Sequence, residues 1–409
     1  MSVFPPDSPT ALAWGAPPSA RYEQLAAPFR PLFARIAAGA VAREVGRLLP
    51  TAELGWLKQS RFTALRIPVE FGGAGATLSE TFALLTELGQ ADSNLVQAVR
   101  GHFGFVEALL NSPDAQRRER WFARLSQGET VGPASSETGD AKRDAFTTQL
   151  VPDGPNWRLT GTKFYTTGSL FADWIDVGAT TPAGERVAAT VRRDAPGVEV
   201  VDDWNGFGQT LTASGTAHFR EVAVKAEDIQ DKQRFGYSPA FFQVFHLANL
   251  AGIGRAMTLE VAQAVAARTR TFTIGNADRV AQDPQILAVV GQVRSAAYCA
   301  GAIAAQNAQA LDRAYDARNS PAQEQAVNVV ELEVCQSLTV ASDLIIDAAG
   351  RLFDALGASA TLRPHALDRF WRNARTLASH NPRVYKDRIV GDYAVNGTPP
   401  PEQWKIGTA

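Results

Sequence analysis

The sequence contains only two cysteines, Cys299 and Cys335, among its 409 residues. Two thiols in apolar helical surroundings are too few for a disulfide framework or a cysteine-based metal site, and they indicate a reducing compartment. We therefore expect a cytoplasmic protein without a structural metal.

Long runs of one kind of residue are also absent. The charges nearly cancel, with 40 Lys and Arg against 42 Asp and Glu, and no basic run stands out, which argues against a nucleic-acid partner. No stretch of 18 or more apolar residues is present, so no membrane span is expected. Residues 1–20 are rich in Pro and Ala but lack the pattern of a signal peptide, and they predict a loose N-terminal arm.

The short motifs of several large enzyme classes are missing. The five histidines are far apart and form no HExxH pattern, so no metal site is expected. No P-loop, no G-x-S-x-G elbow and no G-x-G-x-x-G after a predicted strand occurs. Hydrolase, NTPase and Rossmann-type functions therefore lose their usual support.

The residues that are present divide the chain into helical ends and a strand-rich centre. Six short apolar runs separated by turn residues predict strands between Val131 and Ile229. The apolar spacing on either side is helical. The expected features of these helices are a capping box at Thr77 and Glu80, a helix cap at Ser112-Pro113, a first bundle helix over Phe241–Phe272 and a last helix over roughly Pro364–Tyr393. We predict an α+β fold with an N-terminal helical domain (21–128), a small central β-barrel or sandwich domain (129–235) and a C-terminal four-helix bundle domain (236–409). The Ala-rich bundle helices could also form a subunit interface.

Two segments of the central domain have a composition that differs from that of the predicted strands. Pro133–Gly139 and Gly161–Ser169 are rich in hydroxyl groups and glycine. They can therefore offer backbone N–H groups and side-chain donors to a bound polar ligand.

The last predicted helix contains a further candidate, His380. Pro382 drives Asn381 toward an extended conformation, so the helix should break close to His380. The break can project His380 into a cleft, or His380 can cap the last carbonyls of the helix. The pattern alone leaves both alternatives open.

The order of the domains and a set of short segments resemble the acyl-CoA dehydrogenase superfamily. The segments are Ala134–Glu137, Gly161–Lys163, Asp202–Trp204, Ser214–Gly215 with His218–Phe219, and Asp368–Asn373 followed by Arg375, Thr376 and His380. The likeness runs from about residue 25 to Gly397 and is closest to the flavin-dependent monooxygenase branch, which includes dibenzothiophene and sulfone monooxygenases. It implies the three-domain fold predicted above.

The acyl-CoA dehydrogenases of this superfamily need a carboxylate base to remove a substrate proton. The resemblance places that base near His380, or in some members on the first bundle helix. This chain has no Asp or Glu from Arg375 to Lys386 or from Gly236 to Leu259. An FAD-dependent acyl-CoA dehydrogenase with a displaced base therefore stays only as an alternative, beside a non-catalytic flavin- or acyl-binding scaffold.

The monooxygenase branch implies a different use of the same positions. There, reduced flavin and O₂ form a C4a-(hydro)peroxide that the protein must protect from water and supply with a proton. The resemblance implies His102 and His380 as catalytic histidines and Thr167 as a hydroxyl that faces the flavin. By itself, His102 also fits a satisfied histidine of a helical core. Leu377 stands where the branch's best-known member has a second histidine, so no particular substrate is carried over.

The resemblance also implies a flavin site. Its residues are Ser135, Ser136, Thr167, Gly168 and Ser169 toward the ring and ribityl chain, Arg270 toward the phosphate from a neighbouring subunit, and Arg375. Arg suits phosphate because its planar fork binds two oxygens, although an exposed cation near a helix end is a common alternative. His218 is expected to be structural, and His246 could face the pocket.

The implied cofactor and partners follow from the same comparison. Gly350–Gly357 replaces the FAD-type glycine signature of the family, which favours FMN and leaves FAD possible. No NAD(P)H site is visible, so a separate flavin reductase is expected to supply reduced FMN. We further expect a homotetramer that uses O₂ to oxygenate a small organosulfur or aromatic molecule.

Overall fold

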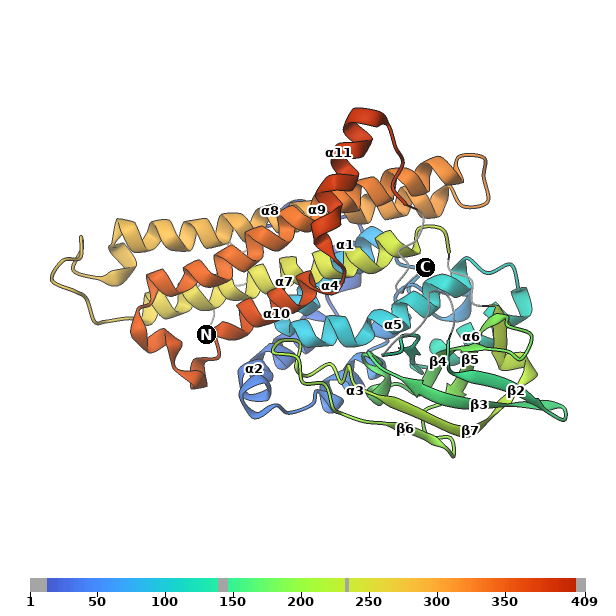
Figure 1. Cartoon of the computed structure of the whole chain (residues 1–409). Coiled ribbons are helices and arrows are strands. Elements are labelled where there is room, and N and C mark those ends of the chain that lie inside the picture. Colours follow the sequence, from blue (N-terminus) through green and yellow to red (C-terminus); the bar gives the residue numbers. More distant parts are fainter. Residues whose placement is uncertain (1–12, 139–145, 232–234, 402–409) are drawn as a thin grey trace.

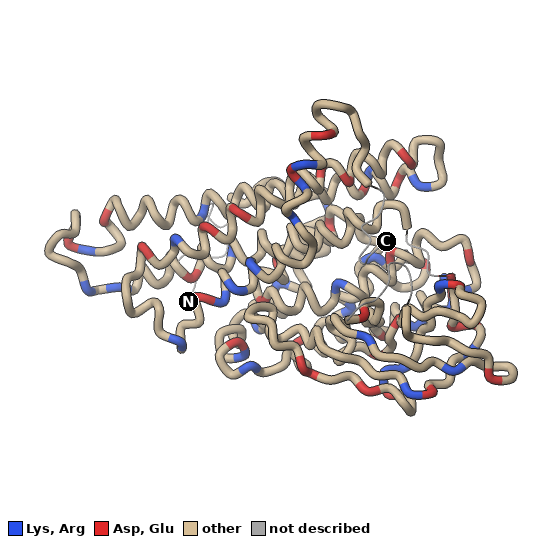
Figure 2. The backbone as a smooth tube through the Cα atoms, in the orientation of Figure 1, with Lys and Arg blue, Asp and Glu red and all other residues tan. Residues whose placement is uncertain are grey.

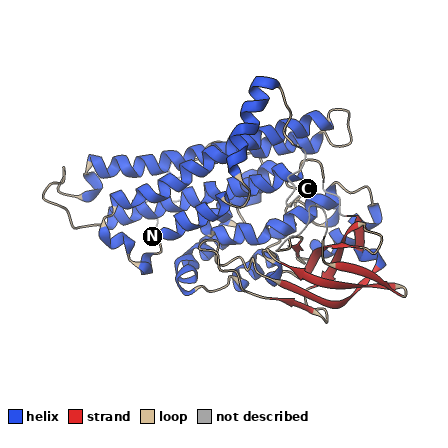
Figure 3. Cartoon of the chain, viewed as in Figure 1, coloured by secondary structure: helices blue, strands red, loops and turns tan. Residues whose placement is uncertain are grey.

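Helix α7 (Ser238–Ala267) is the element on which the other helices pack, and it contacts α8 and α9 of the bundle as well as α4 and α5 of the N-terminal region. The computed structural model describes residues 13–138, 146–231 and 235–401. Figures 1 and 3 show the long helices side by side, with the sheet next to one end of the bundle. The predicted order of helices, a small β unit and helices is confirmed. Residues 1–12 of the predicted arm, and Gly139, lie outside the described residues.

The N-terminal region is helical, as predicted. Its helices are α1 (Tyr22–Ala26), α2 (Arg30–Gly46), α3 (Thr51–Gln59), α4 (Leu78–Ala91), α5 (Ser93–Leu110) and α6 (Ala115–Leu125). The capping box predicted at Thr77 and Glu80 is confirmed, because each side chain accepts a hydrogen bond from the backbone N–H of the other residue. The cap predicted for α6 at Ser112-Pro113 is wrong, because the Asp114 side chain accepts the bond from Arg117 N.

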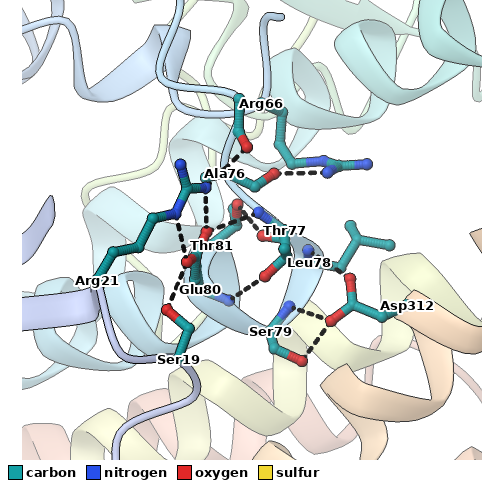
Figure 4. A network of polar contacts seen from close by, with 11 residues as sticks. Ser19, Arg21, Arg66, Ala76, Thr77, Leu78, Ser79, Glu80, Thr81 and Asp312 are labelled. Carbon is teal, nitrogen blue, oxygen red and sulfur yellow. Dashed lines mark hydrogen bonds and ion pairs between the residues drawn. The ribbon is translucent and has the colours of Figure 1, made fainter. Parts of the chain in front are cut away.

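The start of α4 also ties the N-terminal region to the bundle (Figure 4). Asp312 of α8 accepts hydrogen bonds from the Leu78 and Ser79 backbone N–H groups at 2.7 and 3.0 Å. These N–H groups have no partner within the helix, so a carboxylate from another element stabilises them. The entry into α4 is therefore fixed by two carboxylates, those of Glu80 and Asp312.

The central region forms one eight-stranded mixed sheet. Its strands are β1 (Val131–Ala134), β2 (Gln149–Asp153), β3 (Asn156–Lys163), β4 (Trp174–Thr180), β5 (Arg186–Arg192), β6 (Val198–Val200), β7 (Ala217–Lys225) and β8 (Ile229–Asp231). The order is β6-β7-β3-β2-β4-β5-β8, and β1 pairs with β4 in parallel. The sequence patterns had predicted six of these strands and missed β1 and β8.

The bundle contains α7, α8 (Pro284–Asp316), α9 (Gln323–Arg351), α10 (Asp368–Ala378) and α11 (Lys386–Asn396). The single last helix predicted from Pro364 to Tyr393 is wrong in extent, because the chain breaks between α10 and α11. The break contains His380 and Pro382, as the proline rule predicted. Helix α7 ends at Ala267, earlier than the predicted end at Phe272.

The outer face of α8 carries exposed apolar side chains. By length and composition alone, α8 is the one described helix that could cross a membrane, a test that core helices of soluble proteins also pass; 17% of its most apolar window is buried. Leu287 and Tyr298, both 48% exposed, are eleven residues apart and therefore lie on one face. Figure 2 shows charges of both signs interspersed along the chain, in keeping with the net charge of −2.

Candidate functional site

The two hydroxyl-rich segments singled out in the sequence lie side by side. The Ser136 carbonyl accepts a hydrogen bond from Phe164 N at 3.0 Å, and the Ser169 hydroxyl donates to the Pro133 carbonyl at 2.9 Å. Ser169 is buried and uses its hydroxyl for this contact, whereas Ser136 is exposed. Ser169 therefore holds the segments together, and Ser136 leaves its side chain accessible.

A chain of hydroxyl groups follows Thr167. Its Oγ1 lies 2.7 Å from Ser214 Oγ, which lies 2.7 Å from Thr212 Oγ1. The next residue, Gly168, donates its N–H to the Thr212 carbonyl at 2.9 Å. These bonds fix the orientation of the Thr167 hydroxyl, the group expected to face a flavin.

Gly168 fits this loop against α5 because it has no side chain. Its φ is +80°, and a Cβ atom here would lie 2.0 Å from the Ala98 carbonyl oxygen. Both the positive φ and the close approach require glycine. The loop therefore presses directly on the backbone of α5.

Glu137 and Lys163 form an ion pair with each other. Their charged atoms are 2.6 Å apart, and the Lys163 side chain is fully buried. Although burial raises the pKa of Glu137, Lys163 and the Thr147 and Thr148 donors outweigh it and lower the pKa to about 2. The ion pair therefore stabilises the two hydroxyl-rich segments, and the two charges face each other.

Helix α5 connects the hydroxyl-rich loops to the bundle within two turns. A Cβ atom on Gly101 would lie 2.4 Å from Pro133 Cδ, and one on Gly104 would lie 2.5 Å from the Phe242 ring. Arg100 donates from Nε to the Phe242 carbonyl at 3.3 Å, and its guanidinium lies over the Phe242 ring at 4.6 Å. The loops and the first turns of α7 therefore meet along the same stretch of α5.

His246 and His380 form the centre of the candidate site. The rings, from α7 and from the break after α10, have centroids 4.6 Å apart at an angle of 53°. His246 is buried, and its Nε2 has no hydrogen-bond partner among the described residues. His380 is exposed, and its backbone N–H donates to the Leu377 carbonyl at 3.2 Å.

Both imidazoles are held in the neutral form. Burial, the neighbouring His380 and the Arg100 charge lower the pKa of His246 well below its ordinary value. The surrounding protein and Arg100 likewise lower the pKa of His380, against a smaller opposing effect of Asn381. Neutral imidazoles can each donate one N–H and accept one proton.

His102 lies on a different side of α5 and is not brought into contact with His380. Its Nε2 lies 2.8 Å from the Thr63 carbonyl, and its Nδ1 accepts from Val131 N at 3.3 Å. Burial lowers its pKa to about 4, so it is neutral. This is the geometry of a satisfied core histidine, one of the two alternatives for His102. His102 and Gly168 both line one small cavity.

The predicted phosphate ligand lies far from these groups within one chain. Arg270 is exposed in the connection between α7 and α8, which Figure 1 places at the end of the bundle away from the sheet. Arg375 is partly buried on α10, close in sequence to His380. The structure thus places Arg375 on the helix that leads to the site and leaves Arg270 outside it.

One further histidine and one further arginine have structural contacts. His218 Nδ1 lies 3.1 Å from Thr162 Oγ1 across strands β7 and β3, as the structural interpretation predicted. Arg372 of α10 donates to Glu44 at 2.9 Å and to the Phe207 carbonyl at 3.0 Å. The helix that leads to His380 is thereby tied to both other regions of the chain.

Family models match both helical regions of the chain. Residues 29–129 match the acyl-CoA dehydrogenase N-terminal domain, and residues 244–382 match the acyl-CoA dehydrogenase C-terminal domain. Together the two matches cover more than half of the chain.

Curated relatives and solved structures point to one branch of that family. The chain is 28% identical to a dibenzothiophene monooxygenase of Mycolicibacterium goodii (85% of this chain, 87% of the relative) and 28% identical to a probable FMNH₂-dependent monooxygenase, SfnC, of Pseudomonas putida (91% and 94%). Its structure resembles TdsC of Paenibacillus sp. A11-2 in complex with FMN and indole, with a TM-score of 0.84 and 27% identity over 93% of this chain and 99% of that one. It also resembles the methanesulfinate monooxygenase MsuC of Pseudomonas fluorescens, with a TM-score of 0.83 and 26% identity over 92% and 98%.

Proposed function

Because the chain belongs to the acyl-CoA dehydrogenase superfamily and to its flavin-dependent monooxygenase branch, we propose that it uses reduced FMN and O₂ to oxygenate a small organosulfur or aromatic molecule. The relatives include enzymes named for dibenzothiophene and for methanesulfinate. The oxygenated position of the substrate then lies next to the loop of Thr167 and the cleft of His380.

The contact between His246 and His380 carries this proposal. The dehydrogenases place their carboxylate base either beyond the last-helix arginine or on the first bundle helix. In this chain those two places meet, with ring centroids 4.6 Å apart, and both are occupied by histidine. A neutral imidazole is a weaker base than the desolvated carboxylate that dehydrogenation of an acyl-CoA uses, but it can hold and pass one proton.

Two acidic residues of the bundle are engaged by structural partners, which argues against either of them as a displaced base. Glu260 forms an ion pair with Arg369, and Glu331 accepts a hydrogen bond from Ala240 N at 2.6 Å. Each carboxylate thus has a structural partner on α10 or at the start of α7. The dehydrogenase alternative would need one of them to leave that partner.

The loops fit an FMN group. Thr167 presents a hydroxyl oriented by Ser214, Ser136 is exposed beside it, and Gly168 keeps the loop flat against α5. Bound reduced FMN supplies the electrons that activate O₂. On the protein side, Thr167 would hold bound FMN through its hydroxyl, and His380 would hold or accept a proton at its imidazole. The His246 ring packs beside that imidazole at an angle of 53°.

The remaining partners follow from this chemistry. The similarity to an FMNH₂-dependent monooxygenase supports a separate flavin reductase that delivers reduced FMN. Two unpaired cysteines, Cys299 and Cys335, and the dependence on reduced flavin support a cytoplasmic location.

We further propose that the chain assembles as a homotetramer in which Arg270 binds the FMN phosphate of a neighbour. The α8 face with Leu287 and Tyr298 supports this, because a second copy would remove that apolar surface from water. Arg270, Phe272 and Ile274 lie together in the exposed α7–α8 connection. A cation at that end of the bundle reaches a flavin loop only on another copy.

The test of the proposed function uses anaerobic protein mixed with FMNH₂ and then exposed to O₂. We expect tighter binding of FMNH₂ than of oxidised FMN, and oxygenated product from indole, dibenzothiophene or methanesulfinate that is absent without the protein. Titration of both redox states of FMN and mass spectrometry of the products measure this. Tight binding of oxidised FAD, bleached by an acyl-CoA, would instead support the dehydrogenase.

A further inference from the structure

A small cavity lies between α3, α5, β1 and the turn that follows Thr167. Its volume is about 20 Å³, which is room for one molecule of the size of water or O₂ and excludes an organic substrate. Most of its lining is apolar. The apolar lining residues are Leu54, Ala98, Val99, Val131, Phe171 and Ala172.

The polar side chains that line the cavity are mostly engaged by the protein itself. His102 uses both ring nitrogens for contacts with backbone groups. Lys58 and Thr130 both bind Asp173, at 2.6 and 3.1 Å. Of these lining groups, the Thr63 hydroxyl is the one whose oxygen has no partner among the described residues. A buried water needs about two to four polar partners, so the cavity suits a small apolar molecule better than a water.

The position of the cavity connects it to the proposed flavin loop. One of its walls is Gly168, which has no side chain and directly follows Thr167, the residue whose hydroxyl is expected to face FMN. Lys58 and Phe171 are partly exposed, whereas the other lining residues are buried. A small molecule can therefore enter beside Lys58 or Phe171 and reach the backbone of the Thr167 loop.

We propose that this cavity binds O₂ and passes it to FMN held at the Thr167 loop. O₂ is small and apolar, so an apolar cavity beside the loop raises its concentration where reduced FMN consumes it. Gly168 packs directly on the Ala98 carbonyl, and thermal motion of the loop against α5 opens the last step. This inference rests on the proposed oxygenase function and adds to it the route of the second substrate.

Val99 allows a test in both directions, because it is a buried residue of α5 that lines the cavity. Val99→Ala enlarges the cavity, and Val99→Met fills it with a flexible side chain. FMNH₂ is bound anaerobically, and its reoxidation is followed by stopped flow at several O₂ concentrations. The second-order rate constant should rise in Val99→Ala and fall roughly fivefold in Val99→Met, at unchanged affinity for FMNH₂, because a filled cavity excludes even one small molecule. Val99→Ala covers the case in which Val99→Met does not fold.

The matched controls are Val96→Ala and Val96→Met. Val96 is a fully buried valine of the same helix, and it packs in the helical core and not around the cavity. The same exchanges therefore alter the packing of α5 without changing the cavity. Both controls should keep the wild-type rate constant for O₂.

Xenon provides a second measurement that needs no FMN, because this apolar atom binds in dry apolar cavities. Crystals under xenon pressure should show an atom in the cavity of the wild type and of Val99→Ala, and none in Val99→Met. An ordered water that xenon does not displace would overturn the proposal. Equal rate constants for O₂ in the two Val99 variants, or equal changes in the Val96 controls, would do the same.

Failure of the O₂ route and failure of the oxygenase function give different results. If the protein oxygenates indole with FMNH₂ while both Val99 variants reoxidise FMNH₂ at the wild-type rate, the function stands and the O₂ route is refuted. If the rate constant for O₂ follows the size of the side chain at position 99 while indole, dibenzothiophene and methanesulfinate all stay unoxidised, the O₂ route stands and the proposed function is refuted. If FMNH₂ does not bind, both are refuted.

Discussion

His380 and His102 carry the same ring in different surroundings, so their replacement should change different properties. His380→Gln keeps a polar side chain but removes the nitrogen that holds a proton. We expect the variant to bind FMN and oxidise FMNH₂, while oxygenated product forms roughly 100-fold more slowly and H₂O₂ is released instead, a loss typical of an acid–base group. Product and H₂O₂ per O₂ consumed measure this in one assay.

The control for this prediction is His365→Gln. His365 is exposed in the short connection before α10 and should leave the ratio of product to H₂O₂ unchanged. A wild-type ratio in His380→Gln would remove His380 from the reaction.

His102 should affect stability in acid. Its pKa is lowered from 6.5 to about 4 in the folded protein, so between these values the unfolded chain takes up the proton and the folded chain does not. Stability is therefore full above about pH 6.5 and falls as the pH drops toward 4, by up to about 1.4 kcal/mol for each pH unit. His102→Asn should lower the melting temperature at pH 7.5 and flatten its fall between pH 6.5 and 4.

The same variant decides between the two alternatives for His102. If His102 manages a proton of the reaction, as the family resemblance implies, His102→Asn should lose product and release H₂O₂ at an unchanged melting temperature. Buried His246 also resists protonation, so some acid sensitivity should persist in either case.

At the scale of elements, the glycines of α5 determine how closely the hydroxyl-rich loops approach the bundle. Gly104→Ala would place a Cβ atom 2.5 Å from the Phe242 ring, so the ring and the Arg100 side chain over it must shift. We expect a loss of about 1–3 kcal/mol in the free energy of unfolding, as for other overpacked sites. Denaturant unfolding measures it.

Gly55→Ala is the matched control, since Gly55 lies inside α3 and a Cβ atom there meets nothing within 4 Å. The same exchange should stabilise that helix by roughly 0.5–1 kcal/mol, because alanine has less backbone entropy to lose than glycine. Equal effects of the two exchanges would mean that Gly104 is not packed against Phe242.

The elements also show what the sequence could predict. The capping box at Thr77 and the break at Pro382 are local, so residues a few positions apart sufficed to place them. Strand β1 was missed because it contains Gly132-Pro133 and becomes a strand only through its parallel pairing with β4, about forty residues away. A short sequence pattern can predict hydrogen bonds between residues that are close in the sequence. The pairing of strands about forty residues apart depends on the tertiary fold.

The same distinction between local and long-range contacts applies to the candidate site. The hydroxyl-rich loops were recognisable from composition, and an isolated antiparallel bridge between Ser136 and Phe164 joins them. The contact of His246 with His380 joins residues more than a hundred positions apart, and no local pattern contains it.

At the scale of the whole molecule, the proposed assembly would complete each flavin site with a residue from a second chain. The hydroxyl-rich loops lie at the sheet, whereas Arg270 lies in the α7–α8 connection at the other end of the bundle. The exposed apolar face of α8 runs between these ends. A symmetric partner packed on that face in the opposite direction would bring each Arg270 to the other chain's loop.

This arrangement can be tested by mixing two defective chains. Arg270→Ala removes the phosphate ligand, and Gly168→Val distorts the flavin loop, because a side chain there would clash with the Ala98 carbonyl. Each variant alone should bind FMN poorly. In a hybrid dimer, one site combines the intact loop of the first chain with the intact arginine of the second, and the other site carries both defects. Random reassembly of equal amounts should therefore restore about a quarter of the wild-type FMN sites, counted by titration after co-refolding. If Arg270 served its own chain, every site would keep one defect, and mixing would restore none.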